Sequence, residues 1–511
     1  MSYPKKLLRM RPTKGLAFDT PSYELGPDHY SNGNNVIFRN AFARRVGGSR
    51  AVYGTLPVDP VLHILNSRVD TTNFWLFFGA DEVHALETTN SDEVTPSGGL
   101  TAVAQPWQYS STLLNGVPVF TNGFEKPQYW AGNVVTPFAA LPDWPATTSC
   151  KSIVAFKFHL FALDIDGPGG HFENQIKWSD AADPGTVPGA WTPAADNEAG
   201  DALLADTPGP ALMGLALRGT LMLYKRSSTY PVNYVGGNEV FSIGSPAFTS
   251  SGVLTRHGAC DVNGQHFVVT DGDIILTDGT NRRSVGQARM REYLFGSLDQ
   301  DNYENVFTVF NRAKGEVIVA FPEAGSQYCT KALVYDVAND SLGVRDLEDV
   351  TCAAVGIVND TDPDESWAAA AYTWAAASQL WNKQNFSFAT ESLVIGFDDV
   401  AEMQDTEDAV PLDASVGRYD LHFGEPERVK FLRRVHVRAV AGYGTLFVRV
   451  GARMTPSDDI TWSSEQTLTE PEQIVNAFAQ GRYISVEIRS AGSEVWTVTG
   501  IDLEAELRGY F

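Results

Sequence analysis

Residues 255–280 contain three short apolar runs separated by tight turns, and this pattern limits what the chain can fold into. The segment reads TRHGACDVNGQHFVVTDGDIILTDGT, with turns at Asn263-Gly264, Asp271-Gly272 and Asp278-Gly279. Such pairs supply the positive φ angles of the turns that join adjacent antiparallel strands. Each run suits one strand and is too short for a helix. A meander this small cannot bury a core alone, so it must stack on similar units.

Looser copies of this meander recur on both sides of it. They begin near residues 61, 110, 152, 213, 305 and 351. Their spacing of roughly 40–60 residues is that of four-stranded propeller blades. We therefore expect an all-β fold, in which a β-propeller of six blades, or seven, is followed by a C-terminal β-sandwich-like domain.

The chain divides into four expected segments. Residues 1–30 show little periodicity and are locally basic, so we expect an N-terminal arm that is either a frayed terminus or docks on an acidic partner. Residues 31–350 are expected to form the propeller. Residues 351–409, rich in Trp, Ala and acidic residues, connect the two domains or complete the last blade. Residues 410–511 alternate polar and apolar positions in several runs, which is typical of sandwich strands.

The balance of charge and apolar residues excludes several classes of protein. The formal charge is −24, from 38 basic and 62 acidic residues. Proteins that bind nucleic acid through its phosphates need clustered Lys and Arg, so this balance argues against such binding. The apolar content of 43% is ample for packed cores. No run of about 18 apolar residues occurs, so we expect no membrane-spanning segment, and no apolar stretch follows the basic N-terminus as in a secretory signal.

Motifs that carry common chemistry are missing from the sequence. There is no GxxxxGK[ST] loop and no HExxH, the nine histidines are dispersed, and the four cysteines show no CxxC spacing. His257, His266 and His436 lie in strand-like runs, where a structural role is expected. Residues 359–366, NDTDPDES, resemble a calcium loop but lack its glycine and its final glutamate. We therefore expect no catalytic residue, no cofactor and no metal site.

One stretch has a helical spacing of aromatic residues. Trp367, Trp374 and Trp381 lie seven residues apart on an alanine-rich background, so on a helix their indoles would share one face. Such a stripe either packs against the propeller or joins neighbouring subunits, because interfaces are enriched in aromatic residues. These three residues are the candidate subunit-contact stripe.

Several segments, in order, resemble the tail nozzle proteins of short-tailed bacteriophages, also described as tail tubular protein B-like or DNA-stabilisation proteins. The N-terminal NNVIFRNAFARRVGGSRAVYG resembles the opening of that family, as does IKWSDAADPGTVPGAW at residues 176–191. LRGTLMLYKRSSTYPV and the segment from residue 252 to 279 are similar to its propeller core. FVRVGARMTPSDDITWSSEQ, GRYISVEIR and WTVTGIDLEAELRG are similar to its C-terminal β domain. The resemblance covers roughly residues 30–511, and it is least specific over residues 351–409.

The resemblance implies a structural protein of a virion tail rather than an enzyme, assembled in the host cytoplasm. Such nozzles are hexameric tubes below the portal and its adaptor ring, which retain the genome and conduct double-stranded DNA during ejection. The implied partners are further copies of the chain, the adaptor–portal complex and tail fibres or a tail spike. DNA would pass through the lumen without sequence-specific binding.

Two alternatives from other classes stay open. A receptor- or glycan-binding propeller would bind a glycan without turnover. A propeller glycosidase or lyase would act on surface polysaccharide through a carboxylate-lined funnel. The acidic composition favours the nozzle, because a negatively charged lumen lets DNA slide, whereas each phosphate contact made must be broken again.

Overall fold

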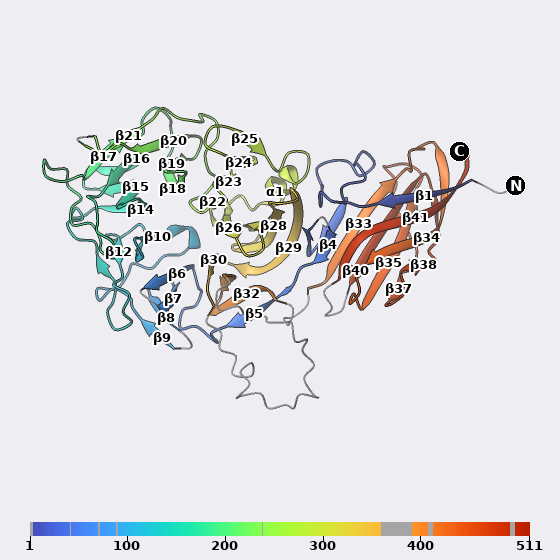
Figure 1. The fold of residues 1–511 in the computed structure, drawn as a ribbon, viewed down its shortest axis with the longest axis horizontal. Coiled ribbons are helices and arrows are strands. Elements are labelled where there is room, and N and C mark those ends of the chain that lie inside the picture. The colour runs from blue at the N-terminus through green and yellow to red at the C-terminus, as the bar shows by residue number, and fades with distance from the viewer. Residues whose placement is uncertain are drawn as a thin grey trace.

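The computed structural model describes residues 4–40, 42–69, 72–87, 90–237, 239–358, 391–406, 412–490 and 496–510, with the side chains of residues 403–406 left out. Its elements are almost all β-strands (Figure 1). One α-helix, α1 (Arg291–Ser297), and two short 3-10 helices, η1 (Pro106–Gln108) and η2 (Tyr303–Asn305), are present in these ranges. The prediction of an all-β chain is confirmed.

Seven four-stranded antiparallel units follow one another along the described chain. The first unit contains β6 (His63–Val69), β7 (Thr72–Phe78), β8 (Val83–Leu86) and β9 (Ser91–Glu93), and the second contains β10 (Ser110–Leu114), β11 (Val117–Thr121), β12 (Gln128–Tyr129) and β13 (Ala139–Ala140). The third contains β14 (Ser149–Phe156), β15 (His159–Gly167), β16 (Gly170–Trp178) and β17 (Gly200–Leu203), the fourth β18 (Ala211–Leu217), β19 (Thr220–Lys225), β20 (Thr229–Tyr234) and β21 (Phe241–Ile243), and the fifth β22 (Ala259–Val262), β23 (Gln265–Val269), β24 (Ile274–Thr277) and β25 (Arg282–Ser284). The sixth contains β26 (Phe307–Asn311), β27 (Glu316–Phe321), β28 (Cys329–Asp336) and β29 (Ser341–Val350), and the seventh contains β30 (Cys352–Gly356), β31 (Ser392–Phe397), β32 (Val400–Thr406) and β5 (Gly48–Val52).

The first strands of these units lie side by side around a common centre (Figure 1). Successive contacts run from β10 through β14, β18, β22 and β26 to β30, β30 then contacts β6, and β6 contacts β11 of the second unit. The arrangement is consistent with a β-propeller. The meander at residues 255–280 forms the fifth unit, and Asn263 and Gly264 take the positive φ angles of 52° and 78° expected of its first turn.

Neighbouring units bury their apolar side chains against one another. The first two units bury Phe78, Phe120 and Trp130 in one cluster, and the seventh and first bury Val52, Trp75 and Val394 in another. Similar clusters lie between the other neighbours that surround the centre. Apolar positions on both faces of each sheet are therefore covered by the sheets on either side.

A second domain packs two sheets against each other at the other end of the molecule (Figure 1). One sheet contains β2 (Asn32–Asn34), β33 (Ala414–Leu421), β40 (Tyr483–Ser490), β35 (Thr445–Arg453), β36 (Thr461–Trp462) and β37 (Gln466–Thr469). The other contains β1 (Lys5–Met10), β4 (Phe42–Arg45), β41 (Thr497–Tyr510), β34 (Arg428–Ala439), β38 (Ile474–Val475) and β39 (Ala479–Gly481). We refer to this second sheet as the C-terminal sheet.

One continuous sheet joins the two domains. Strand β3 (Val36–Arg39) pairs with β29 of the sixth unit on one side and with β4 on the other, and β4 pairs with β41. The sixth unit and the C-terminal sheet thus belong to a single 11-stranded sheet.

The N-terminal segments lie elsewhere than expected. Residues 1–30 were expected as an arm, but β1 pairs with β41 along its whole length, because Leu8 and Met10 alternate with basic residues and face the core. Strands β2 and β4 lie with the second domain instead of the propeller, β3 lies between the two, and β5 pairs with β32 in the seventh unit. Of residues 351–409, the described strands β30–β32 form that unit.

Candidate functional site

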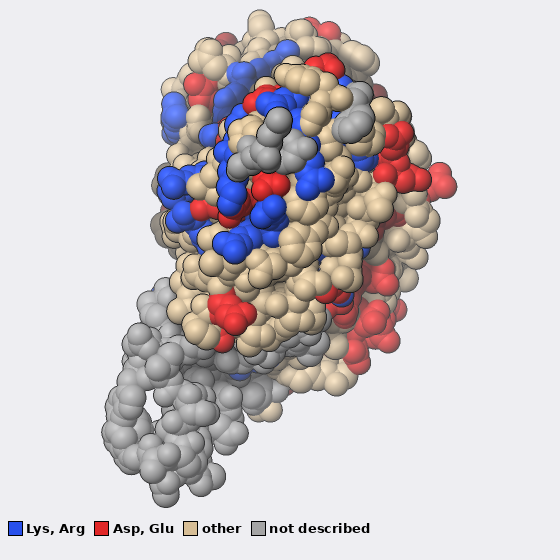
Figure 2. Space-filling model, turned by 90° about the vertical axis from the view of Figure 1, so that its right-hand side faces the viewer, with Lys and Arg blue, Asp and Glu red and all other residues tan. Residues whose placement is uncertain are grey.

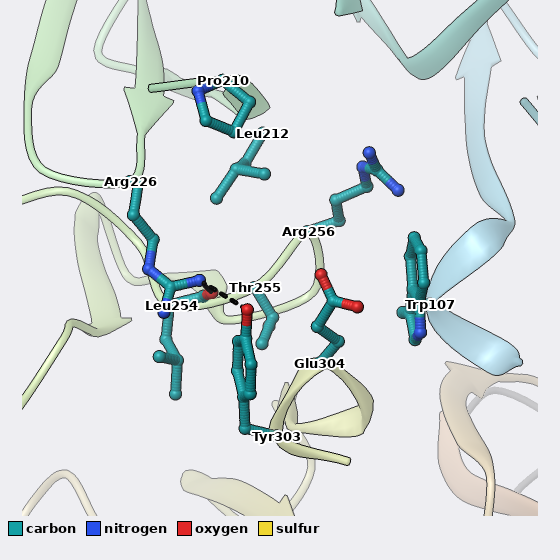
Figure 3. Close-up of a pocket in the computed structure, with 9 residues that line it drawn as sticks. All are labelled: Trp107, Pro210, Leu212, Arg226, Leu254, Thr255, Arg256, Tyr303 and Glu304. Carbon is teal, nitrogen blue, oxygen red and sulfur yellow. Dashed lines mark hydrogen bonds between the residues drawn. The ribbon is translucent and has the colours of Figure 1, made fainter. Parts of the chain in front are cut away.

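A pocket of about 250 Å³ lies where four of the units meet near their common centre. The segments that precede the first strands of the second, fourth, fifth and sixth units supply most of its walls, and Arg226 after β19 completes it. Its lining residues are Trp107, Pro210, Leu212, Arg226, Leu254, Thr255, Arg256, Tyr303 and Glu304 (Figure 3). No single stretch of sequence contains these residues.

Arg226 lines this pocket and forms no ion pair with a carboxylate among the described residues. Its Nη1 donates hydrogen bonds to the Leu254 carbonyl and the Tyr303 hydroxyl, each at 3.2 Å. Its guanidinium also lies 4.8 Å from the centre of the Tyr303 ring, a cation–π geometry. These contacts fix the guanidinium without neutralising it, so an anionic group could bind there.

Arg256, by contrast, is held in a buried ion pair. Its Nη2 lies 3.2 Å from Oδ2 of Asp164, and its guanidinium stacks over Trp107 at 5.1 Å. Asp164 has a φ of 57° at a bulge between β15 and β16, which directs its side chain inward, and it also accepts a hydrogen bond from His171. Burial lowers the pKa of Arg256, and the Asp164 carboxylate opposes this shift.

The pocket combines one carboxylate with two arginines and two aromatic rings. Glu304 is the single carboxylate among the lining residues, whereas canonical glycoside hydrolysis uses a pair of carboxyl groups across the scissile bond. The Trp107 and Tyr303 rings and the Arg226 cation are groups that can hold an anionic sugar, with Glu304 accepting hydrogen bonds from hydroxyls.

Two histidines beside this pocket are packed groups. Nε2 of His63 lies 2.7 Å from the Ser111 hydroxyl, and Nε2 of His257 donates to the Tyr109 carbonyl at 2.9 Å. Burial lowers the pKa of His63 to about 3 and that of His257 to about 4. Both rings are therefore neutral at pH 7, which agrees with the structural role expected of His257.

The other two histidines considered from the sequence lie apart. His266 is buried, where its Nδ1 accepts a hydrogen bond from the Tyr224 hydroxyl and its Nε2 donates to the Ala216 carbonyl. His436 lies in β34 of the second domain.

The remaining sequence candidates give no further site. Trp367, Trp374 and Trp381, and the acidic run at 359–366, lie outside the described residues. Within the described ranges, no group of three or more His, Cys, Asp and Glu side chains could hold a metal ion. All four cysteines are free thiols. In the same ranges, no helix has the length and apolar character needed to cross a membrane.

Charge is divided unequally between the two domains. Residues 46–409, the stretch that contains every strand of the seven units, hold 19 basic and 45 acidic residues. Residues 1–45 and 410–511 together hold 19 basic and 17 acidic residues. Residues 46–409 therefore carry a net charge of −26, and the rest of the chain carries +2.

Comparison with known proteins gives distant structural likeness alone. No protein-family model matches the sequence, and no curated protein is detectably similar to it. The WD40 β-propeller domain of Doa1 is similar with a TM-score of 0.38 and 11% identity, over 71% of this chain and 98% of that one. A functionally unknown protein from Desulfotomaculum acetoxidans DSM 771 is similar with a TM-score of 0.31 and 10% identity, over 56% of this chain and 90% of that one.

Proposed function

We propose that the chain is a structural, non-enzymatic component of a bacteriophage tail and forms the hexameric nozzle below the portal and its adaptor ring. Six copies would enclose a lumen that retains the genome and conducts double-stranded DNA during ejection. The other partners are the adaptor–portal complex and tail fibres or a tail spike, and the chain resides in the virion tail after assembly in the host cytoplasm. The sequence resemblance over residues 30–511 suggested this role.

The charge of the repeat-built part is the observation that carries the proposal. Residues 46–409 have 26 more acidic than basic residues, since they hold 45 and 19. Each phosphate contact to DNA gains free energy by releasing counterions, and that gain must be repaid when the DNA moves on. A wall that repels polyanions instead leaves DNA free to slide.

The architecture that we propose is a seven-bladed β-propeller fused to a β-sandwich. The circle of contacts that closes from β30 to β6 supports seven blades, one of the two counts expected from the sequence. The shared 11-stranded sheet supports a subunit in which the two domains move as one. Such a body suits a conduit that must keep its bore under load.

The mass of the native particle tests this proposal. Light scattering of the purified full chain, alone and with a candidate adaptor ring, should give a particle of six 55.7 kDa chains, or a monomer that becomes a sixfold ring on the adaptor. A strict monomer that ignores the adaptor would overturn the proposal.

A second candidate function is the binding of an acidic glycan at the Arg226 pocket. It rests on the Arg226 guanidinium, which ion-pairs with no described carboxylate and is held by Leu254 and Tyr303. Calorimetric titration with uronic-acid oligosaccharides should then show binding that Arg226→Ala weakens by about tenfold or more, as for other charge-assisted hydrogen bonds. Equal affinity of the variant, or no binding by the native chain, would exclude this function.

A further inference from the structure

The outer face of the C-terminal sheet is an exposed layer with no second sheet upon it. Across the paired strands, Leu8 of β1, Leu503 of β41 and Val435 of β34 share one face and are packed into the core. The opposite face therefore carries the alternate residues in three rows, which are Lys5, Glu506 and Phe431; Leu7, Glu504 and Arg434; and Arg9, Asp502, His436 and Ile474. We call this surface the basic face.

The basic face is positive because its carboxylates lie beneath its cations. The Arg433 side chain is 45% exposed, whereas its partner Glu506 is 10% exposed. Arg438 is 40% exposed above Asp502, which is 6% exposed, and Lys5 likewise covers Glu504. Figure 2 views this end of the molecule and shows Lys and Arg side chains gathered over the second domain.

Two arginines on this face have spare charge. Arg9 and Arg434 are exposed, and neither forms an ion pair with a carboxylate within the described ranges, since Asp502 is bonded to Arg438. A partner that brings carboxylates to these two side chains would therefore gain contacts that the isolated chain lacks.

Apolar side chains between the charges indicate a protein partner rather than a nucleic acid. Leu7, Ile474 and Phe478 are exposed on or beside this face. Phe478 stacks on Phe431 with ring centres 6.1 Å apart, and Arg508 lies 4.2 Å from the centre of the Phe431 ring. Aromatic and arginine side chains together are typical of protein interfaces, whereas a surface that reads only DNA phosphates needs cations alone.

The opposite end of the long axis offers the complementary surface. Strands β16 and β17 form the outer edge of the third unit, at the left of Figure 1, whereas the basic face lies at the right. This edge exposes Phe172 and Leu203 together with acidic side chains. We call it the acidic edge; its residues are Asp166, Phe172, Glu173, Asp201, Leu203 and Asp206. Asp201 is ion-paired with Lys177 at 3.8 Å, whereas Asp166, Glu173 and Asp206 form no ion pair within the described ranges.

We propose that the basic face of one copy of this chain docks on the acidic edge of the next copy. The two surfaces differ, so the contact is heterologous and leads to a ring if the rotation closes. The inference rests on the proposed ring and specifies which surfaces form it. It also explains why apolar and charged groups of opposite sign are placed at the two ends of one elongated molecule.

Charge-reversal variants of the full chain test the contact. Arg9→Glu with Arg434→Glu should raise the dissociation constant for self-association at least about tenfold, because like charges would then face each other. Glu173→Lys with Asp166→Lys should do the same from the other side, because neither carboxylate forms an ion pair within the described ranges. The variant with all four substitutions should recover affinity to within about threefold, since opposite charges meet again. Arg312→Glu, an exposed cation in the loop between β26 and β27, is the matched control.

Sedimentation equilibrium at low and high salt gives the dissociation constants for self-association. If the chain assembles only on the adaptor ring, the same measurement is made with that ring present. Weakening by both pairs and recovery in the combined variant would support the contact, and so would weaker association of the native chain at high salt. If the native chain assembles and the reversals change nothing, the inference fails while the ring survives. A native chain that stays monomeric under every condition overturns both, and a basic face that instead binds duplex DNA tightly at physiological salt overturns the choice of partner.

Discussion

Charged and polar side chains near the centre of the repeat-built part differ in whether they leave a charge without an oppositely charged partner. Arg256 and His171 both bond to the Asp164 carboxylate, and His63 and His257 are each held by a hydrogen bond and packed rings. These groups are structural because every charge has a partner or is suppressed by burial. Arg226 differs, since its hydrogen-bond acceptors are neutral.

The buried histidines should make stability depend on pH. Burial lowers the pKa of His257 to about 4 in the folded chain, whereas an unfolded histidine titrates near pH 6.5. Between these values the unfolded state binds more protons, so the free energy of unfolding should fall as pH falls from about 6.5 toward 4. His257→Gln should reduce that slope by up to about 1.4 kcal/mol per pH unit.

Urea denaturation at several pH values between 4.5 and 7 measures this slope. His436→Gln is the control for loss of a histidine outside the buried cluster, in β34 of the second domain. An unchanged slope in the His257 variant would mean that its ring is already solvated or charged in the folded chain.

At the scale of elements, the joint between β29 and β3 decides whether the two domains behave as one body. The two strands are paired through Val344 and Val36. Gly343 permits this approach, because a Cβ atom placed there would lie 2.3 Å from the Val36 carbonyl oxygen. Backbone atoms cannot retreat as a flexible side chain can, so a larger residue must separate the strands.

Gly343→Ala should therefore destabilise the chain by about 1–3 kcal/mol, the usual cost of overpacking. It should also split unfolding into two transitions, because the domains would lose their common sheet. Calorimetry of the native chain and the variant measures both effects. Gly296→Ala in α1, where an added Cβ meets nothing within 4 Å, should be neutral or slightly stabilising. A single, unshifted transition for Gly343→Ala would show that the joint does not couple the domains.

Elements defined by local turns were predictable from the sequence, and elements that pair over long distances were not. Asn263-Gly264 fixes the hairpin of β22 and β23 within a few residues. Strand β5, by contrast, pairs with β32 some 350 residues later, and β1 pairs with β41 near the other end of the chain. Neither short strand carries a signal that names its distant partner, so residues 1–45 looked like an arm and the start of a propeller.

The candidate sites were hidden from the sequence for the same reason. Arg226, Arg256 and Trp107 belong to three different units and meet only when the circle closes. On the basic face, Lys5, Leu7 and Arg9 alternate in a recognisable way, but their neighbours Arg434 and Glu504 come from β34 and β41. The overall charge could be counted from the sequence. The separation of acidic and basic residues between the two ends of the molecule could not be predicted, because it depends on the pairing of the N-terminal strands with the C-terminal ones.

At the scale of the whole molecule, the separation of charge gives the chain a direction. The repeat-built part holds 45 of the 62 acidic residues, while the second domain and the N-terminal strands hold half of the 38 basic ones. Such a molecule repels polyanions along most of its surface and attracts acidic surfaces at one end. We therefore expect the basic end of one copy to face the acidic end of the next. We also expect the acidic part not to bind DNA.

The full chain should therefore show no saturable binding to duplex DNA at physiological salt, even at protein concentrations of about 10 µM. Non-specific DNA binding depends on phosphates that are neutralised by clustered cations, and the cations of the basic face are interleaved with Leu7, Phe478 and Ile474. Fluorescence anisotropy of a labelled duplex of about 30 base pairs, repeated at low salt with a basic protein as positive control, measures this binding. Tight binding that falls steeply with added salt would show that the chain holds DNA through its phosphates. The proposal that an acidic wall lets DNA slide would then fail. Weak binding confined to low salt and lost in Arg9→Glu with Arg434→Glu would instead locate the residual attraction on the basic face and leave the acidic wall free of DNA.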